Sequence, residues 1–318
     1  MSEAPALVVE NLSLAIGDAT VVDGVGFSVA PGEVLAIVGE SGCGKSLTAA
    51  AVMRLLPSAI RQTGGRVVLE GQDITALPER RMQALRGRQM SMIFQEPQAA
   101  LDPLATVGSQ VAEALRMDAR SARPQVLRML EEVGISDPAK RIDQYPFELS
   151  GGMCQRVMIA CALISRPAVL LADEPTTALD VTIQAQILDL LRTLATERRT
   201  GVVLITHDMG VVADIADRVA VMYAGRIAES GPTEAIFAAP RHPYTSLLLA
   251  SIPRLTDVPK SALAVIEGRV PTPAEFGPGC RFAGRCPLAD AHCEAQTPPL
   301  APIGEGRLSA CWHAEQVR

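Results

Sequence analysis

Apolar residues fall into short runs bounded by turn residues along much of the chain, a pattern typical of β-strands. The run at 34–38 is uninterrupted, which predicts a strand buried on both faces of a sheet. A glycine-rich segment and then an alanine-rich helical stretch to about Leu56 follow it directly. We expect the runs at 67–69 and 91–94 to form a strand pair. The other runs predict strands at 7–9, 21–22, 24–29, 169–172, 202–205, 219–223 and 226–230.

Between about Glu96 and Ser150 the periodicity changes, because apolar residues recur three and four positions apart with charged residues between them. That spacing predicts amphipathic helices, notably at 112–115 and 126–133. Another helix is predicted from about 183 to 196, between two of the buried strands. The chain is therefore expected to have an α/β core that is interrupted by a helical insertion.

From about Ala238 the composition shifts toward proline, and four of the seven cysteines lie in this last segment. Proline lacks the backbone N–H and fixes φ, so its density predicts an irregular, loop-rich extension rather than another α/β unit.

Charge and hydropathy narrow the class of protein. Lys+Arg 29 against Asp+Glu 35 gives a formal net charge of −6, so no basic surface for a nucleic acid is expected. The longest apolar run, Val157 to Ile164, has eight residues, whereas a bilayer-spanning helix needs about 20. The first residues, MSEAPALVVE, lack the basic and apolar regions of a secretory signal. We therefore expect a cytoplasmic chain whose cysteines are reduced thiols or metal ligands.

The glycine-rich segment reads G-E-S-G-C-G-K-S and lies between the predicted buried strand and the predicted helix. Glycines let backbone N–H groups approach phosphate oxygens, and the helix N-terminus favours negative charge. Lys45 would reach the β- and γ-phosphates, and the Ser46 hydroxyl would bind Mg²⁺. A turn without a ligand is the weaker alternative for so complete a motif. The expected nucleotide-binding residues are Gly39, Glu40, Ser41, Gly42, Cys43, Gly44, Lys45, Ser46 and Leu47.

The apolar run at 169–172 ends in two acids, Asp173 and Glu174. Asp173 would hold the water shell of Mg²⁺ opposite Ser46, and Glu174 would polarise the attacking water as a general base. Two acids after a strand are often only a solvated turn. Combined with the phosphate loop, they predict hydrolysis of ATP.

A second anion-binding helix N-terminus is predicted at Ser150, Gly151 and Gly152, where a serine cap precedes two glycines. One chain has no use for two γ-phosphate sites unless another chain completes each of them. The motifs together resemble the ATP-binding subunit of an ATP-binding cassette (ABC) transporter, a P-loop NTPase. In that family two such domains dimerise head to tail, with ATP between the phosphate loop of one and the signature sequence of the other.

The resemblance assigns roles to three further residues. It implies that Gln95 senses Mg²⁺ and contacts the transmembrane partner, that Asp180 lies in the loop that communicates across the dimer, and that His207 contacts the γ-phosphate. It implies an ABC ATPase core with an antiparallel β-subdomain at 1–95 and 151–237, a helical subdomain at 96–150 and an extension at 238–318. The implied catalytic residues are Glu174, His207, Lys45 and Gln95. The implied Mg²⁺ ligands are Ser46, Gln95 and Asp173.

Further residues narrow the resemblance to the oligopeptide/dipeptide importer branch. These are Tyr-Pro-Phe-Glu at 145–148, Met153, and Arg-His-Pro-Tyr-Thr at 241–245 before an apolar helix. The branch implies two permease subunits, a second and different ATPase, an external solute-binding protein and a place on the cytoplasmic face of the inner membrane. Relatives also import nickel, opines, glutathione or sugars, so this sequence does not identify the transported solute. Ile16 stands where many members stack an aromatic residue on adenine.

Two other functions are disfavoured. A soluble ABC ATPase acting on ribosomes or nucleic acid would usually carry two cassettes or a long coiled coil, and this acidic chain has neither. A phosphate-loop kinase would have no use for the signature sequence or for His207.

The cysteines of the extension, Cys280, Cys286, Cys293 and Cys311, are spaced C-x5-C-x6-C-x17-C. Four thiolates are the ligand set of a tetrahedral zinc or of an iron–sulfur cluster. The spacing matches neither a zinc ribbon nor a ferredoxin, and unrelated buried cysteines are the alternative. Some members of the importer branch carry a [4Fe–4S] cluster in this tail, so the resemblance favours the cluster over zinc. Its role, structural or redox-regulatory, stays open.

Overall fold

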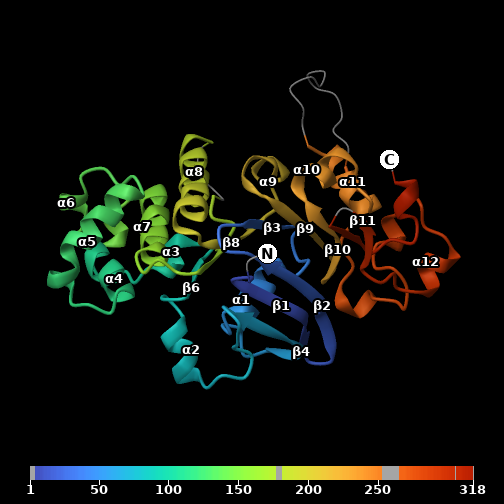
Figure 1. Cartoon of the computed structure of the whole chain (residues 1–318), viewed down its shortest axis with the longest axis horizontal. Helices are drawn as coiled ribbons and strands as arrows, with labels where there is room; N and C mark the ends of the chain where they lie inside the picture. The colour runs from blue at the N-terminus through green and yellow to red at the C-terminus, as the bar shows by residue number, and fades with distance from the viewer. Residues whose placement is uncertain (1–3, 177–180, 253–264, 305, 318) are drawn as a thin grey trace. The chain divides into compact units, whose positions relative to one another are not determined.

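The computed structural model describes residues 4–176, 181–252, 265–304 and 306–317 (Figure 1). It divides into two compact units. Unit 1 comprises Met1–Leu7, Val29–Glu33 and Leu69–Leu204, and unit 2 comprises Val8–Ser28, Val34–Val68 and Ile205–Arg318.

The strands of unit 2 confirm several of the predicted runs. β3 (Val34–Val38) is buried at all five positions and pairs in parallel with β9 (Arg218–Tyr223). β9 pairs antiparallel with β10 (Arg226–Pro232). In a separate sheet β2 (Ala19–Val29), β1 (Leu7–Ile16) and β4 (Ile60–Leu69) are neighbours in that order. The predicted runs at 21–22 and 24–29 thus belong to one strand.

The expected pair between 67–69 and 91–94 is wrong. The first run belongs to β4, whereas the second is β6 (Met90–Ile93), which pairs in parallel with β7 (Val169–Asp173) in the other sheet. Sequence neighbours often pair, but parallel pairing joins distant segments through a crossover. Met90 and Ile93 are fully buried, as expected for a strand in a doubly covered sheet.

Helices make up most of the rest of unit 1, including the segments that the sequence predicted to be helical. α4 (Val107–Ala114) and α5 (Ala119–Glu132) cover the two predicted segments, and α4 contacts both α5 and α7 (Gly151–Leu163). Figure 1 shows these helices gathered together, in green. Thr106 and Asp118 cap α4 and α5 by accepting backbone hydrogen bonds from Ser109 and Ser121. The other elements of this unit are α2 (Glu79–Leu85), α3 (Pro97–Ala100), α6 (Pro138–Arg141), α8 (Val181–Arg198), the 3-10 helix η1 (Pro146–Glu148), β5 (Gln72–Asp73) and β8 (Gly201–Thr206).

The helix after the phosphate loop, α1 (Lys45–Val52), ends before the expected Leu56. Arg54 has φ 51°, which a right-handed helix does not contain, and Pro57 follows closely. The remaining helices of unit 2 are α9 (Met209–Ile215), α10 (Thr233–Ala238), α11 (Pro243–Ala250), α12 (Ala291–Ala295) and the 3-10 helices η2 (Pro273–Glu275), η3 (Ala283–Arg285) and η4 (Ala314–Gln316). No helix in the described ranges has the length and hydropathy needed to cross a bilayer.

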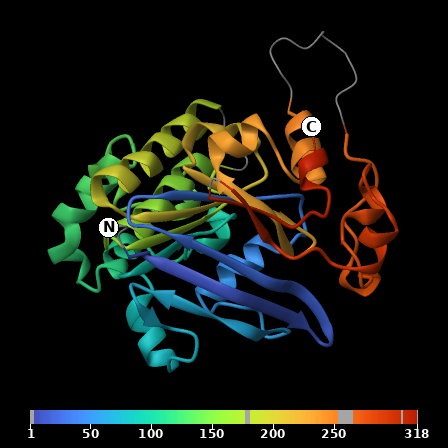
Figure 2. The ribbon, with the colours of Figure 1, turned by 45° about the vertical axis from the view of Figure 1, so that its right-hand side comes forward.

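The extension is mostly irregular, as expected, but it also contributes two strands to a sheet. β11 (Ala301–Gly304) pairs antiparallel with β12 (Arg307–Ser309), and β12 pairs antiparallel with β10, Glu229 opposite Ser309. Figure 2 shows the extension, coloured orange to red, beside these strands. The proline-rich tail therefore continues the sheet of unit 2.

A buried ion pair anchors this added hairpin. The Glu229 side chain is fully buried, and its carboxylate accepts from Arg307 Nη2 at 2.9 Å. The backbone N–H groups of Arg241 and His242 donate to the same carboxylate, at 2.9 and 3.0 Å. Every hydrogen bond of this set joins the extension to β10.

Arg307→Met is expected to lower the free energy of unfolding by about 3–5 kcal/mol, because it leaves a buried carboxylate without its charge partner. The matched control is Arg269→Met, which breaks an exposed, solvent-screened pair with Glu275 and should lower the free energy of unfolding far less. Urea unfolding of both variants gives the two values. Equal losses would contradict this assignment.

Candidate active site

The phosphate-loop segment, residues 39–46, joins β3 to α1 as predicted. Gly42 and Gly44 have φ of 80° and 99°, in the region that favours glycine. A Cβ built on Gly39 would lie 2.1 Å from the backbone oxygen of Met222. The loop therefore has a shape that only glycine permits at these positions.

Lys45 folds back over the loop that precedes it. Its side chain is buried, and Nζ donates to the backbone oxygens of Gly39 at 2.7 Å and Glu40 at 3.0 Å. An ammonium group is thus held inside a loop that opens at the N-terminus of α1. This is the arrangement that attracts phosphate groups.

The three cysteines outside the extension, Cys43, Cys154 and Cys161, behave as packing residues. Burial raises the pKa of the Cys43 thiol, although Lys45 opposes this. Cys154 is buried, and its Sγ lies 3.4 Å from the backbone oxygen of Pro146. Burial raises the pKa of Cys161 to about 12. All three are neutral thiols near pH 7, so none has the thiolate character of a reactive cysteine.

Gln95 and Glu174 meet in unit 1. Ile93 lies opposite Ala172 in the parallel pair of β6 and β7, so the two strands end side by side. Gln95 Nε2 donates to Glu174 Oε2 at 3.1 Å. Glu174 has φ 46°, a costly conformation for a residue with a side chain, and such strain is often found at active sites.

The signature segment begins α7. The Ser150 hydroxyl accepts from the backbone N–H of Met153 at 3.4 Å. A Cβ built on Gly151 would meet nothing within 4 Å, so its own chain does not require glycine there. The absence of a side chain leaves the backbone N–H groups of this helix end open to a close approach.

The predicted site residues are divided between the two units. Gln95, Asp173, Glu174 and the signature residues belong to unit 1, and the phosphate loop and His207 belong to unit 2. Asp173 is buried at the end of β7, and His207 is exposed after β8. Asp180 lies outside the described residues.

Two contacts on Glu40 were not predicted from the sequence. The backbone N–H of Glu40 donates to the Tyr244 hydroxyl at 2.8 Å, and its carboxylate pairs with Arg285. The partners lie 204 and 245 positions away along the chain. No local pattern in the sequence could have indicated them.

The four cysteines of the extension line one cavity. Burial raises the pKa of each thiol, and the neighbouring cysteines raise it further for three of them, Cys286, Cys293 and Cys311. Backbone N–H groups of Leu288 and His313 donate to the sulfurs of Cys286 and Cys311, at 3.4 and 3.3 Å. The structure therefore brings together all four residues that the spacing singled out.

A second group of potential ligands overlaps the lining of this cavity, because Cys293 and His313 both line it. In the described part of the chain, one group of three potential metal ligands has its ligand atoms within 4.8 Å of one another. It consists of Asp290, Cys293 and His313. His313 Nε2 lies 3.0 Å from an Asp290 carboxylate oxygen. Sequence reasoning gave neither Asp290 nor His313 a role.

His242 lies in the segment 241–245 and caps α11. Its Nδ1 accepts from the backbone N–H of Tyr244 at 3.1 Å, and the ring is buried. Burial lowers the pKa of His242 to about 4, although a backbone hydrogen bond to Ala310 opposes this. The ring is therefore neutral at pH 7.

Acidification is expected to destabilise the fold through His242. The unfolded chain takes up this proton near pH 6.5 and the folded chain only near pH 4, so stability falls as the pH drops through that interval. The loss should reach about 3 kcal/mol. His242→Asn keeps an acceptor for Tyr244 and should flatten the slope, whereas His292→Asn, at an exposed histidine, should not. A slope that survives His242→Asn would refute the assignment.

A family model described as "ABC transporter" matches residues 22–177, and one described as "Oligopeptide/dipeptide transporter, C-terminal region" matches residues 228–293. The chain is 48% identical to the dipeptide transport ATP-binding protein DppD of Bacillus subtilis, over 98% of this chain and 95% of that one. It is also 48% identical to a probable peptide ABC transporter ATP-binding protein of Sinorhizobium fredii, over 97% of this chain and 92% of that one.

Solved structures give the same picture for the cassette. The ATP-binding cassette MJ0796, as a dimer bound to ADP and Pi, superposes with a TM-score of 0.64 at 27% identity. The superposed region covers 71% of this chain and 98% of MJ0796. CbiO1 of Clostridium perfringens, part of the transporter complex cbiONQ, gives 0.64 at 28% identity over 74% of this chain and 92% of its own.

Proposed function

Since the chain belongs to the family of ABC transporter ATP-binding subunits, in its oligopeptide/dipeptide branch, we propose that it hydrolyses ATP to drive the import of peptides. The family is an ATPase family, and the solved cassettes confirm the predicted fold class of the ATPase core. The observation that carries the proposal is the identity of 48% to a dipeptide transport ATP-binding protein over nearly both full lengths. The alternative, action on ribosomes or nucleic acid, gains no support from these relatives.

The chemistry at the site follows from the residues that would hold ATP and Mg²⁺. The loop glycines present backbone N–H groups to the phosphates, and Lys45 would exchange its loop carbonyls for phosphate oxygens. Ser46, Asp173 and Gln95 would supply the oxygen ligands that Mg²⁺ prefers. When bound, Mg²⁺ would neutralise charge on the phosphates.

Glu174 is our candidate general base. It follows β7 directly, and its carboxylate is already oriented by the Gln95 amide. A carboxylate in this place can accept the proton of the attacking water. His207 would contact the γ-phosphate and orient the attack, and catalysis otherwise consists of positioning and electrostatic stabilisation.

In this proposal, partner chains complete the transporter complex. Ser150, Gly151 and Gly152 would bind the γ-phosphate held by a second ATPase subunit, and Asp180 would communicate across that dimer. The second ATPase is a different chain, and two permease subunits and an external solute-binding protein form the rest of the importer. The proposed domains are the core at 1–95 and 151–237, the helical subdomain at 96–150 and the extension at 238–318. The chain would lie on the cytoplasmic face of the inner membrane.

We also propose a [4Fe–4S] cluster in the cavity of the extension, held by Cys280, Cys286, Cys293 and Cys311. The convergence of four thiols and the backbone donors to two sulfurs support it, since such donors are typical around cluster ligands. A single zinc, with Zn–S bonds of about 2.3 Å, would draw the sulfurs to about 3.8 Å from one another. Within the described residues no three of these four sulfurs lie within 4.8 Å of one another.

Elemental analysis of the anaerobically purified chain separates these alternatives. Iron and inorganic sulfide in equal amounts would support the cluster. Zinc without iron would support a zinc site, and the absence of all three would favour four plain thiols. A Cys286→Ser variant should lose the metal in either of the first two cases.

The transport role is tested by the chain's partners. A tagged chain is purified in mild detergent from its native membranes, and the co-purifying proteins are identified. Two multi-spanning permeases and a second ATPase are the expected result. Recovery of only ribosomal or DNA-bound proteins would overturn the proposal.

A further inference from the structure

Glu40 places a negative charge inside a loop that has to bind a polyanion. Its carboxylate belongs to the second residue of the phosphate loop. An unpaired carboxylate there would repel the phosphates of ATP, because both charges are negative and lie in a partly dry environment. The loop therefore needs a cation at this position in addition to Lys45.

Arg285 supplies that cation from the extension. Its Nη1 lies 2.6 Å from Glu40 Oε2, and its Nη2 lies 3.0 Å from Glu40 Oε1, which is a bidentate pair. The Arg285 side chain is 7% exposed and that of Glu40 is 29% exposed. The pairing raises the pKa of Arg285, so its charge is permanent.

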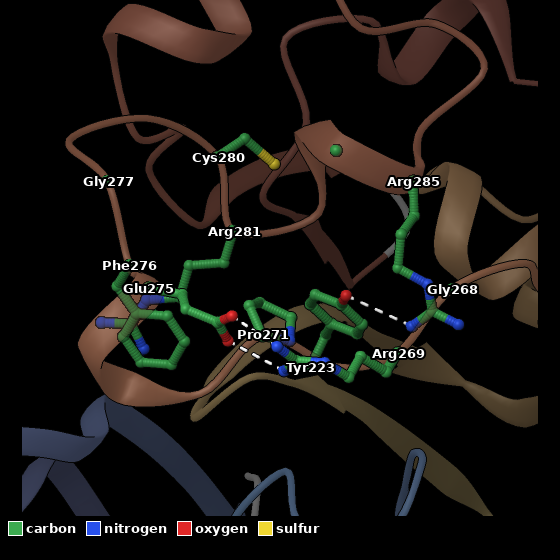
Figure 3. A pocket seen from close by; sticks show the side chains of 11 residues that line it. Tyr223, Gly268, Arg269, Pro271, Glu275, Phe276, Gly277, Cys280, Arg281 and Arg285 are labelled. Atoms are coloured by element: carbon green, nitrogen blue, oxygen red, sulfur yellow. Dashed lines mark hydrogen bonds and ion pairs between the residues drawn. The ribbon is translucent and has the colours of Figure 1, made fainter.

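The extension fixes the orientation of this guanidinium. Arg285 Nε donates to the backbone oxygen of Glu267 at 2.7 Å, and Nη2 donates to that of Ile266 at 3.0 Å. Nη1 also donates to the Tyr223 hydroxyl at 3.3 Å, and Figure 3 shows Arg285 directed toward this ring at the wall of a cavity of about 420 Å³. The orientation of the Arg285 guanidinium toward the loop is thus fixed by hydrogen bonds to Glu267, Ile266 and Tyr223.

Glu40 is in turn connected to the group that binds phosphate. Its backbone oxygen accepts from Lys45 Nζ, its backbone N–H donates to Tyr244, and its carboxylate pairs with Arg285. A displacement of Glu40 therefore moves an acceptor of the Lys45 ammonium. Arg285 can therefore affect phosphate binding in two ways. It neutralises the Glu40 carboxylate, and it fixes the position of the Glu40 backbone oxygen that accepts from Lys45.

We propose that Arg285 is a positioning residue for ATP, through which the cysteine-rich extension sets the affinity of the phosphate loop for nucleotide. The proposal rests on the proposed function of the loop in binding ATP. Arg285 ends the 3-10 helix η3 and is followed directly by Cys286, which lines the cysteine cavity. The fold of the extension around that cavity is thereby linked to the loop through the Arg285 side chain.

Arg285→Gln removes the charge and keeps a side chain of similar length. We expect the Kd for ATP to rise about tenfold or more, because a charged hydrogen-bonded pair is broken beside the phosphates. The rise should appear in Kd and KM, with a smaller change in kcat, and it should shrink at high salt. Arg285→Lys restores the charge without the bidentate geometry and should give an intermediate Kd.

The decisive test is the same substitution in a Glu40→Gln background. Where the carboxylate is absent, Arg285→Gln should change the Kd for ATP less than twofold. An equal change in both backgrounds would overturn the proposal, because Arg285 would then act by another route. Arg269→Gln, in the same extension but paired with Glu275, is the matched control and should leave the Kd unchanged.

Two measurements keep this test independent of folding and of the transport role. Thermal unfolding of the full chain shows whether Arg285→Gln remains folded, and the Arg285→Lys result repeats the test with a milder change. If the wild-type chain binds no ATP, the proposed function fails. If it binds ATP and Arg285→Gln binds equally well, only this inference fails.

Discussion

Glu174→Gln is expected to lower the kcat of ATP hydrolysis by about 10²- to 10⁴-fold while the chain still binds ATP. The substitution keeps the shape of the side chain and removes the basic oxygen that would accept the proton of water. It also keeps a partner for the Gln95 amide, because the glutamine retains one acceptor oxygen. The loss should therefore reflect chemistry rather than a collapse of the site.

Single-turnover hydrolysis together with nucleotide binding separates these two effects. Glu197→Gln is the matched control, since Glu197 is an exposed residue of α8 in the same unit. It should hydrolyse ATP at the wild-type rate. Wild-type turnover by Glu174→Gln would show that the base lies elsewhere, and Gln95 and Asp173 would have to be reconsidered.

Lys45→Met is expected to abolish measurable ATP binding and to reduce hydrolysis by about 10²-fold or more. Methionine retains most of the aliphatic length but loses the ammonium group. The backbone oxygens of Gly39 and Glu40 would also lose a buried donor, which costs about 1–3 kcal/mol of stability for each unsatisfied group. The variant should thus lose function mainly because the charge is missing. It should lose stability because the loop carbonyls of Gly39 and Glu40 lose their donor.

The two losses are distinguished by measuring thermal unfolding and the Kd for ATP on the same preparation. Lys140→Met removes an exposed lysine of α6 and should change neither. A Lys45→Met variant that binds ATP with wild-type affinity would contradict the placement of the phosphates at this loop.

Local patterns predicted the features that depend on local chemistry. The uninterrupted run at 34–38 is the buried strand β3, and the glycines after it have the φ values that the phosphate loop needs. The amphipathic spacing after Glu96 likewise identified α4 and α5. In these segments the period of the side chains alone determines which face is buried.

Pairing over long distances could not be predicted in the same way. β6 was expected to pair with a neighbour in the sequence, yet it pairs with β7 about 80 positions later. β12 was missed because its buried Arg307 looks like a surface residue until Glu229 is seen opposite it. The contact of Arg285 with Glu40 is of the same kind, since only the folded chain brings the two charges together.

ATP hydrolysis by this chain is proposed to drive peptide import, and an uptake assay with the isolated complex can show or refute this coupling. The complex that co-purifies with the chain is reconstituted into proteoliposomes with its binding protein, and entry of labelled di- and oligopeptides is measured with ATP at the chain's side. We predict ATP-dependent accumulation of at least one peptide class, lost with Glu174→Gln. Hydrolysis of ATP by the wild-type complex without accumulation of any of these peptides would contradict the account.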